Sequence, residues 1–197
     1  MESPEKVSDY IIQWLIDYAE KSKMTGFIIG ISGGIDSALT STLCAMTKKA
    51  VLCLEMPIKQ EEDQLIRSSN HIEWLESKFE NVNSIRLNLD SVFDSFCSIL
   101  PESKNQEAHE LSLANTRARL RMSSLYYFAA LNNYLVAGTG NKVEDFGVGF
   151  YTKYGDGGVD LSPIADLTKT QVFDLAGHLS IIDIIQKAPP TDGLWND

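Results

Sequence analysis

The chain has 197 residues, 44% of them hydrophobic and 22% charged, and a formal net charge of −10 at pH 7. This length allows a sizeable core, and we expect one domain over residues 1–197. The acidic balance argues against a nucleic-acid partner, because a phosphate backbone is bound by clustered Lys and Arg. Without a signal-peptide layout or an apolar run of membrane-spanning length, the sequence indicates a soluble cytoplasmic protein with no membrane partner.

The first predicted element is an amphipathic helix over residues 8–23. Ile11, Leu15 and Tyr18 recur there at helical spacing, and Ser8 is placed to cap the N-terminus.

Short apolar segments then alternate with helical ones. The predicted strands cover residues 26–32, 50–57 and 84–90, and the predicted helices cover 37–49, 61–79 and 91–100. Strands that are apolar almost throughout and are connected by helices are typical of a parallel sheet covered on both faces. We therefore expect an α/β fold with a doubly wound parallel sheet.

The second half of the chain is predicted to contain a long helix, a fourth strand and a last helix. These elements cover residues 111–133, 134–140 and 169–179. The long helix should bury Leu120, Leu125, Phe128 and Leu131. A glycine-rich segment at 147–163 is too irregular for a regular element, and long loops inside compact domains are usually functional or disordered.

The cysteines and histidines suggest no chemistry. Without a CxxC pattern or a histidine at ligand spacing, the three cysteines favour reduced core thiols over a disulfide or zinc framework. The three histidines are predicted to be solvated or to cap helices. These residues are Cys44, Cys53, Cys97, His71, His109 and His178.

The segment "FIIGISGGIDSALTSTL", residues 27–43, reads as a strand, a glycine loop and a helix. Gly33 and Gly34 permit positive φ and close backbone approach, so N–H groups can converge on an anion at the start of the helix. The loop lacks the lysine of a GxxxxGKS/T motif, and Asp36 in its place would repel a bare phosphate. The loop therefore predicts a phosphate site in which Asp36 holds a divalent cation such as Mg²⁺.

The hexapeptide "SGGIDS" in this loop resembles the pyrophosphate loop of the N-type ATP pyrophosphatases. Four further motifs, "NTRARLRM", "GTGNKVE", "TKYGDGGVDLSPIADLTKTQV" and "PPTDGLW", occur in the order and spacing of the ammonia-dependent NAD synthetases. The resemblance runs from about Gly30 to Trp195. It implies a Rossmann-like adenine nucleotide alpha hydrolase architecture and the ATP-dependent amidation of deamido-NAD with ammonia.

The resemblance also implies roles for individual residues. The residues implied to bind ATP are Gly30, Ile31, Ser32, Gly33, Gly34, Ile35, Asp36, Ser37, Thr139, Lys169 and Thr191. Those implied to bind deamido-NAD are Arg119, Lys153 and Asp160, and those implied to act in catalysis are Asp36, Lys169 and Asp160. Met56 and Pro57 follow the second strand, where the superfamily places adenosine.

The implied magnesium ligands are Asp36 and Glu144. One more residue separates Glu144 from "TKYGDGG" than in many family members, which makes Asp145 a rival ligand. Arg117 and Arg121 are read as an ordinary exposed face or an interface pair.

Several alternatives remain open at this point. The family normally continues beyond "PPTDGLW" with an acidic segment and a final helix, so we expect a C-terminal closing segment to be missing; a degenerate nucleotide binder is the alternative. The same adenylation chemistry could serve another carboxylate or a tRNA base. The resemblance further implies a homodimer with deamido-NAD at or near the subunit interface, and ammonia drawn from solution or a separate partner.

Overall fold

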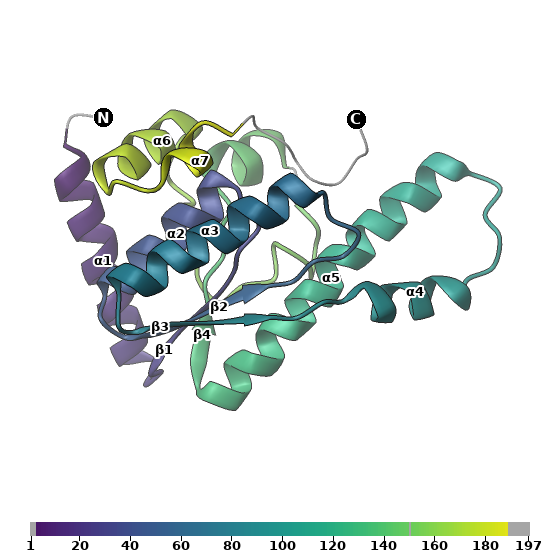
Figure 1. Cartoon of the computed structure of the whole chain (residues 1–197), viewed down its shortest axis with the longest axis horizontal. Helices are drawn as coiled ribbons and strands as arrows, with labels where there is room; N and C mark the ends of the chain where they lie inside the picture. Colours follow the sequence, from purple (N-terminus) through teal and green to yellow (C-terminus); the bar gives the residue numbers. More distant parts are fainter. Residues whose placement is uncertain (1–2, 150, 189–197) are drawn as a thin grey trace.

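The computed structural model describes residues 3–149 and 151–188. A parallel sheet lies at its centre, with the strand order β3-β2-β1-β4 (Figure 1). The strands are β1 (Gly26–Gly30), β2 (Ala50–Glu55), β3 (Val82–Arg86) and β4 (Tyr134–Val136). The chain moves from β1 to β3 in one direction and then places β4 on the other side of β1. The topological switch point therefore lies between β1 and β4, which is where open α/β sheets bind ligands.

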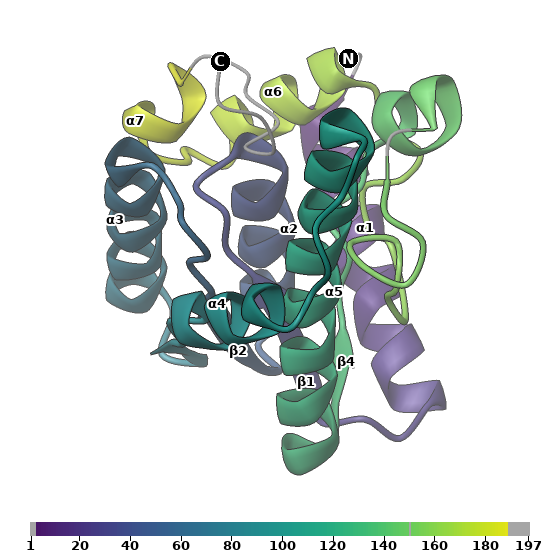
Figure 2. The same ribbon diagram turned by 90° about the vertical axis from the view of Figure 1, so that its right-hand side faces the viewer.

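Helices cover both faces of the sheet (Figure 2). On one side α2 and α3 pack on the strands, and α1, α6 and α7 pack against these helices; α5 covers β1 and β4 from the other side. The helices are α1 (Pro4–Lys21), α2 (Ile35–Met46), α3 (Glu62–Lys78), α4 (Asp90–Ser98), α5 (Gln106–Asn132), α6 (Lys169–His178) and α7 (Asp183–Gln186), with a π-helical segment η1 (Val143–Val148). The predicted doubly wound α/β fold is confirmed.

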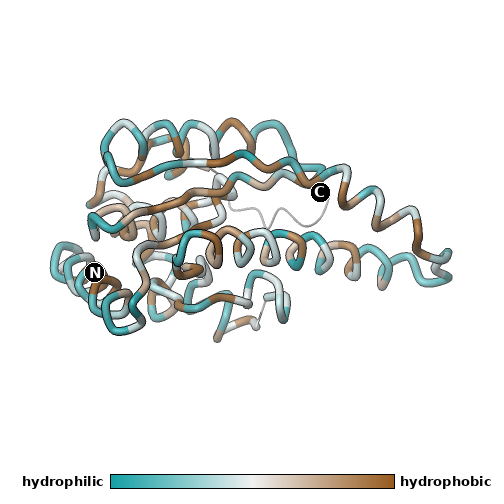
Figure 3. Tube along the Cα trace, turned by 90° about the horizontal axis from the view of Figure 1, so that it is seen from below, coloured by the Kyte–Doolittle hydropathy of each residue, from teal (hydrophilic) through white to brown (hydrophobic). Residues whose placement is uncertain are grey.

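Side chains alternate between the two faces along each central strand. Phe27 and Ile29 of β1 join the core beneath α2, whereas Ile28 joins the core beneath α5. All three are fully buried. Figure 3 shows the corresponding hydropathy along the chain. Burying both faces explains why the strands are apolar without interruption.

The first helix begins earlier than predicted. Ser3 caps α1 by accepting from the Lys6 N–H at 3.4 Å, and Pro4 occupies the first turn, where its missing N–H costs nothing. The prediction that Ser8 caps the helix was wrong. Ser8 is buried inside α1, and its hydroxyl donates to the Glu5 carbonyl at 2.8 Å.

The long helix α5 also begins earlier, because Asn105 caps it by accepting from the Ala108 N–H at 3.1 Å. Leu120, Leu125 and Phe128 pack against the core as predicted. The prediction for Leu131 was wrong, since it is 68% exposed.

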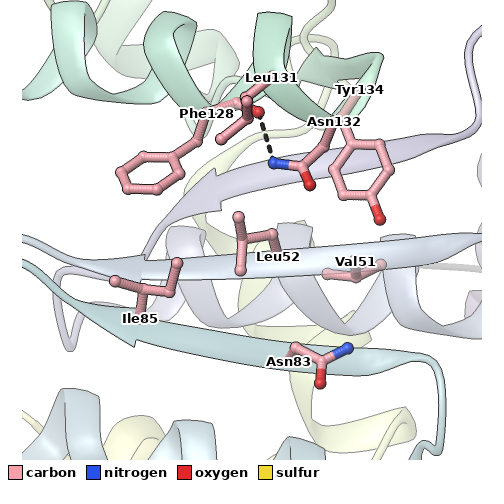
Figure 4. Close-up of a pocket in the computed structure, with 8 residues that line it drawn as sticks. All are labelled: Val51, Leu52, Asn83, Ile85, Phe128, Leu131, Asn132 and Tyr134. Carbon is pink, nitrogen blue, oxygen red and sulfur yellow. Dashed lines mark hydrogen bonds between the residues drawn. The ribbon is translucent and has the colours of Figure 1, made fainter.

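Leu131 is exposed because the last turn of α5 lies over an open part of the sheet. A cavity of about 290 Å³ separates this turn from β2 and β3 (Figure 4). Its lining residues are Val51, Leu52, Asn83, Ile85, Phe128, Leu131, Asn132 and Tyr134. Most of the strand residues among them lie near the amino ends of β2, β3 and β4, so the cavity opens away from the edge of the sheet where β1 and β2 end.

Cys44 and Cys53 are buried free thiols, as predicted. The solvated or capping role predicted for His71 was wrong. His71 is fully buried, its Nε2 lies 2.9 Å from the Ser41 hydroxyl, and its ring stacks on Trp74 with centroids 5.5 Å apart. Burial lowers the pKa of His71 to about 4. No helix within the described residues is long and apolar enough to cross a membrane.

His71 makes the stability of the fold depend on pH. Its folded-state pKa of about 4 lies below the ordinary value of 6.5, so the unfolded chain takes up a proton first as the pH falls. The contribution of His71 to the free energy of unfolding has its full value well above pH 6.5 and decreases as the pH falls towards 4. We expect a loss of about 2 kcal/mol from this residue between pH 7 and pH 5.

Urea unfolding of wild type and His71→Gln at both pH values measures this loss. The variant should be less stable at pH 7 but should lose less stability on acidification. Equal losses in the two proteins would contradict the assignment.

Candidate active site

Three chain segments meet at the carboxyl end of the sheet, beside the β1/β4 switch point. The loop after β1 leads into α2, the segment after β4 leads into η1, and the N-terminus of α6 lies against both. Parallel strands bring these connections to one edge because all their carboxyl ends point the same way.

The glycine loop after β1 is held by its own serines. The Ser32 N–H donates to the Ser37 hydroxyl at 3.3 Å, and the Gly34 N–H donates to the Ser32 hydroxyl at 3.2 Å. The Ser37 hydroxyl in turn donates to the Gly34 carbonyl at 3.0 Å. Gly34 caps α2 without a side chain, so the first N–H groups of this helix are presented to the loop. This arrangement suits an anion.

Helix α3 presses against the same loop. Gly33 has φ of +83°, and a β-carbon there would lie 2.6 Å from the Gln64 carbonyl oxygen. The Gly33 carbonyl accepts from Arg67 Nε at 3.3 Å. Only glycine fits this backbone conformation and this close approach.

Two acids and one lysine form a charged cluster beside the loop. Lys169 Nζ lies 2.5 Å from Asp36 Oδ2 and 3.1 Å from Glu144 Oε1. Burial alone would lower the pKa of Lys169, but the hydrogen bonds and charges of the two carboxylates outweigh it and raise the pKa above its ordinary value. The sequence prediction that these three residues share one site is consistent with this contact.

The local sequence fixes where each member of the cluster lies. Asp36 is in the first turn of α2, and Glu144 is in the first turn of η1. Lys169 is the first residue of α6 and directly follows the N-cap Thr168, which forms a capping box with Gln171. The helix dipole disfavours a cation at that position, and the two carboxylates offset this cost.

The rival acid, Asp145, lies next to this cluster. Its carboxylate covers Gly140 so closely that a β-carbon on Gly140 could not be accommodated. Partial burial and the charges of Glu144, Asp156 and Asp36 raise the pKa of Asp145. Glu144 is the acid that shares Lys169 with Asp36.

Sequence reasoning missed Asn141 as a member of the site. Asn141 is fully buried, and its Nδ2 donates to Asp36 Oδ1 at 3.0 Å. Its Oδ1 accepts from the N–H groups of Val143 at 3.0 Å and Glu144 at 3.2 Å. The available signal was its place inside "GTGNKVE", between the two residues that were selected there. Thr139, the first of these two, is half-buried just beyond β4.

The predicted dinucleotide contacts lie in two places. Arg119 of α5 donates from Nε to the Lys153 carbonyl at 3.3 Å, which joins the helix to the glycine-rich loop. Lys153 Nζ lies 5.0 Å from the ring centroid of Tyr154. Asp156 shapes this loop by accepting from the Thr152 N–H at 2.9 Å.

Asp160, the third predicted contact, lies against β4 and α5. Its carboxylate accepts from the Val136 N–H at 2.8 Å and from the Tyr126 hydroxyl at 3.0 Å. Burial, together with the hydrogen bond and charge of Asp160, raises the pKa of Tyr126 to about 12. In the described structure this carboxylate therefore binds the end of β4, from which the chain continues to Asn141 and Glu144. Thr191, predicted to bind ATP, lies outside the described residues.

The interpretation that Arg121 lies on an ordinary exposed face was wrong, because its side chain is partly buried. Its Nε donates to the Met56 carbonyl at 3.0 Å, at the carboxyl end of β2. Burial, and then the charge of Arg117, lower the pKa of Arg121 to about 10. The guanidinium carbon of Arg117 lies 5.4 Å from the centroid of the Phe93 ring.

The sequence pattern of the NAD synthase family matches residues 7–197. The chain belongs to the NAD synthase family. It is 39% identical to the NH(3)-dependent NAD(+) synthetase of Carboxydothermus hydrogenoformans, over 97% of this chain and 76% of that protein.

Two solved structures are similar to this chain in both sequence and fold. The NMN synthetase from Francisella tularensis is 31% identical with a TM-score of 0.88, over 98% of this chain and 77% of that one. The NH3-dependent NAD synthetase from Campylobacter jejuni is 31% identical with a TM-score of 0.83, over 94% and 77%. The predicted ATP pyrophosphatase architecture is thereby confirmed.

The charged cluster fits a magnesium site that a nucleotide would complete. Asp36 and Glu144 both reach one nitrogen atom, so their carboxylates are close enough to share a cation. Within residues 3–149 and 151–188 no group of three or more His, Cys, Asp or Glu side chains is arranged as a metal site. Mg²⁺ is commonly held by one or two carboxylates together with substrate phosphates.

Gly33→Ala tests whether the shape of the glycine loop governs nucleotide binding. The substitution forces a side chain into positive φ against the Gln64 carbonyl, so we expect a destabilisation of roughly 1–3 kcal/mol. The displaced loop should also weaken ATP binding about 10-fold or more, measured by calorimetry.

Gly177→Ala in α6 is the matched control. The nearest atom to its added β-carbon would be 3.6 Å away, so it should leave ATP binding unchanged and stabilise the helix slightly. Unaltered ATP affinity in Gly33→Ala would contradict the role of the loop.

Proposed function

We propose that this chain amidates deamido-NAD with ammonia at the expense of ATP, forming NAD, AMP and pyrophosphate. The observation that carries the proposal is the Asp36, Lys169 and Glu144 cluster beside a glycine loop at the β1/β4 switch point. The similarity to proteins named NH3-dependent NAD synthetase supports the same reaction.

In the first step the nicotinate carboxylate attacks the α-phosphorus of ATP, and the bond from that phosphorus to the bridging oxygen breaks. The departing pyrophosphate needs hydrogen-bond donors and positive charge. The N–H groups at the start of α2 supply the donors, and the Lys169 ammonium supplies a charge next to the loop.

In the second step ammonia attacks the activated carbonyl carbon, AMP leaves with the bonding electrons, and the new amide nitrogen loses a proton. The carboxylates of Asp36 and Glu144 are the groups that would hold Mg²⁺. The bound ion supplies charge neutralisation for the phosphate oxygens.

We assign recognition of the dinucleotide to Arg119, Lys153 and Asp160. The contact between Arg119 and the Lys153 carbonyl supports the first two, because it joins Arg119 of α5 to the loop that carries Lys153. A guanidinium and an ammonium suit the negative groups of a dinucleotide. Asp160 would have to bind substrate with a carboxylate that already accepts two hydrogen bonds.

A mononucleotide substrate is a second candidate. This candidate is supported by the similarity of the chain to the NMN synthetase from Francisella tularensis, with a TM-score of 0.88. The amidation chemistry is unchanged, and the substrate would be the deamidated mononucleotide.

An endpoint assay distinguishes these candidates. Wild type is incubated with ATP, Mg²⁺, ammonium and either deamido-NAD or deamido-NMN, and AMP, pyrophosphate and the amide product are quantified together. We expect equal amounts of AMP and NAD, and a fall of roughly 100-fold or more in turnover for Asp36→Asn.

Glu5→Gln is the matched control for Asp36→Asn, because Glu5 is an exposed acid in the first turn of α1. It should retain wild-type turnover. Faster amidation of the mononucleotide would favour the second candidate, and formation of neither amide would contradict both.

We further propose that the chain is a cytoplasmic homodimer. The arm formed by α4 and the first half of α5 extends away from the sheet (Figure 1) and exposes apolar side chains. These are Val92 at 48%, Phe96 at 39%, Ile99 at 77% and Leu111 at 49% exposed. The resemblance implies a homodimer, and we propose a second copy as the occupant of this surface because exposed apolar surface is typical of interfaces.

Sedimentation equilibrium of wild type and Leu111→Glu measures this association. Wild type should have twice the mass of one chain, and a buried glutamate at the interface should weaken dimerisation by about 10-fold or more. A monomeric wild type at assay concentration would contradict the homodimer.

A further inference from the structure

The side-chain amide of Asn141 links the two acids of the charged cluster. Its Nδ2 donates to the Asp36 carboxylate at 3.0 Å, while its Oδ1 accepts from the N–H groups of Val143 and Glu144. The residue is fully buried, so water does not compete for these hydrogen bonds. One amide therefore holds the side chain of the first acid and the backbone of the second.

These contacts leave one orientation for the amide. The oxygen must face the two backbone N–H groups, and the nitrogen must face the carboxylate. In the flipped amide the NH₂ group would face the N–H groups of Val143 and Glu144, and the amide oxygen would face the negatively charged carboxylate of Asp36.

Asn141 and Lys169 each donate a hydrogen bond to a different oxygen of the Asp36 carboxylate. Oδ1 accepts from Asn141 at 3.0 Å and Oδ2 from Lys169 at 2.5 Å, so both oxygens are fixed in direction. Lys169 reaches the site on a long side chain, whereas Asn141 acts through a short one next to the main chain. The amide consequently sets the Asp36 carboxylate relative to the turn that carries Glu144.

We propose that Asn141 is a positioning residue that fixes the separation and orientation of the Asp36 and Glu144 carboxylates, so that both bind one divalent cation. This role rests on the proposed function, in which these acids hold Mg²⁺ beside ATP. Hydrogen-bond partners orient metal-ligating carboxylates, and their loss typically weakens metal binding roughly 10–100-fold.

A role limited to capping η1 predicts different effects. Serine is as good as asparagine at accepting hydrogen bonds from the first N–H groups of a helical turn. Its shorter side chain ends before it can reach Asp36. Asn141→Ser therefore keeps a cap and removes the link between the acids, whereas Asn141→Ala removes both.

The test is a titration of Mn²⁺ into each protein in the presence of α,β-methylene-ATP, with free Mn²⁺ followed by electron paramagnetic resonance. This analogue cannot be cleaved between its α- and β-phosphates, so the measurement needs no turnover. We expect the Mn²⁺ dissociation constant to rise about 10-fold or more in both variants, with the urea midpoint of Asn141→Ser close to that of wild type.

Asn81→Ala is the matched control. Asn81 is a partly buried amide just before β3, which donates to the carbonyls of Ala45 at 2.9 Å and Lys49 at 2.7 Å. Its loss should lower the urea midpoint without changing the affinity for Mn²⁺.

The outcomes separate this inference from the function on which it rests. An Mn²⁺ affinity of Asn141→Ser within about twofold of wild type would overturn the positioning role and leave the amidation proposal standing. A wild type that binds Mn²⁺ but forms no amide product would overturn the proposed function, while the titration still decides the positioning role. A wild type without Mn²⁺ affinity would overturn the positioning role.

Discussion

The ion pairs of Lys169 with Asp36 and Glu144 are the interaction on which the arrangement of the site depends. Two carboxylates next to each other at the edge of a sheet repel, and partial burial strengthens this repulsion. The single ammonium contacts both carboxylates and reduces this repulsion, although one positive charge balances only one of the two negative charges. Because the three residues come from α2, η1 and α6, the contact forms only when three separate parts of the chain have folded against one another.

The sheet makes such a meeting possible. Its order places β1 and β4 side by side, so the loop that follows each strand leaves the same edge in neighbouring positions. The fully buried side chains of Phe27, Ile28 and Ile29 fix β1 from both faces. The strand therefore fixes where the loop begins, while the serines of the loop and the contact of Gly33 with Arg67 in α3 fix the conformation of its tip.

Much of this architecture was predictable because local patterns carry it. The uninterrupted apolar strands indicated a sheet covered on both faces, and the acid inside the glycine loop indicated a cation. His71 shows what was overlooked. Ser68, His71, Ile72 and Leu75 are the buried residues of α3 and recur at helical spacing, but the polar members of that stripe obscured it.

Other features depend on contacts that a sequence pattern does not express. Arg121 is partly buried because the end of β2 lies beside α5, and Leu131 is exposed because the last turn of α5 lies over an open cavity. Asn141 has the sequence signature of an ordinary turn residue, since asparagine is frequent in turns for its own local hydrogen bonds. Its contact with Asp36 bridges 105 positions of the chain and follows only from the strand order.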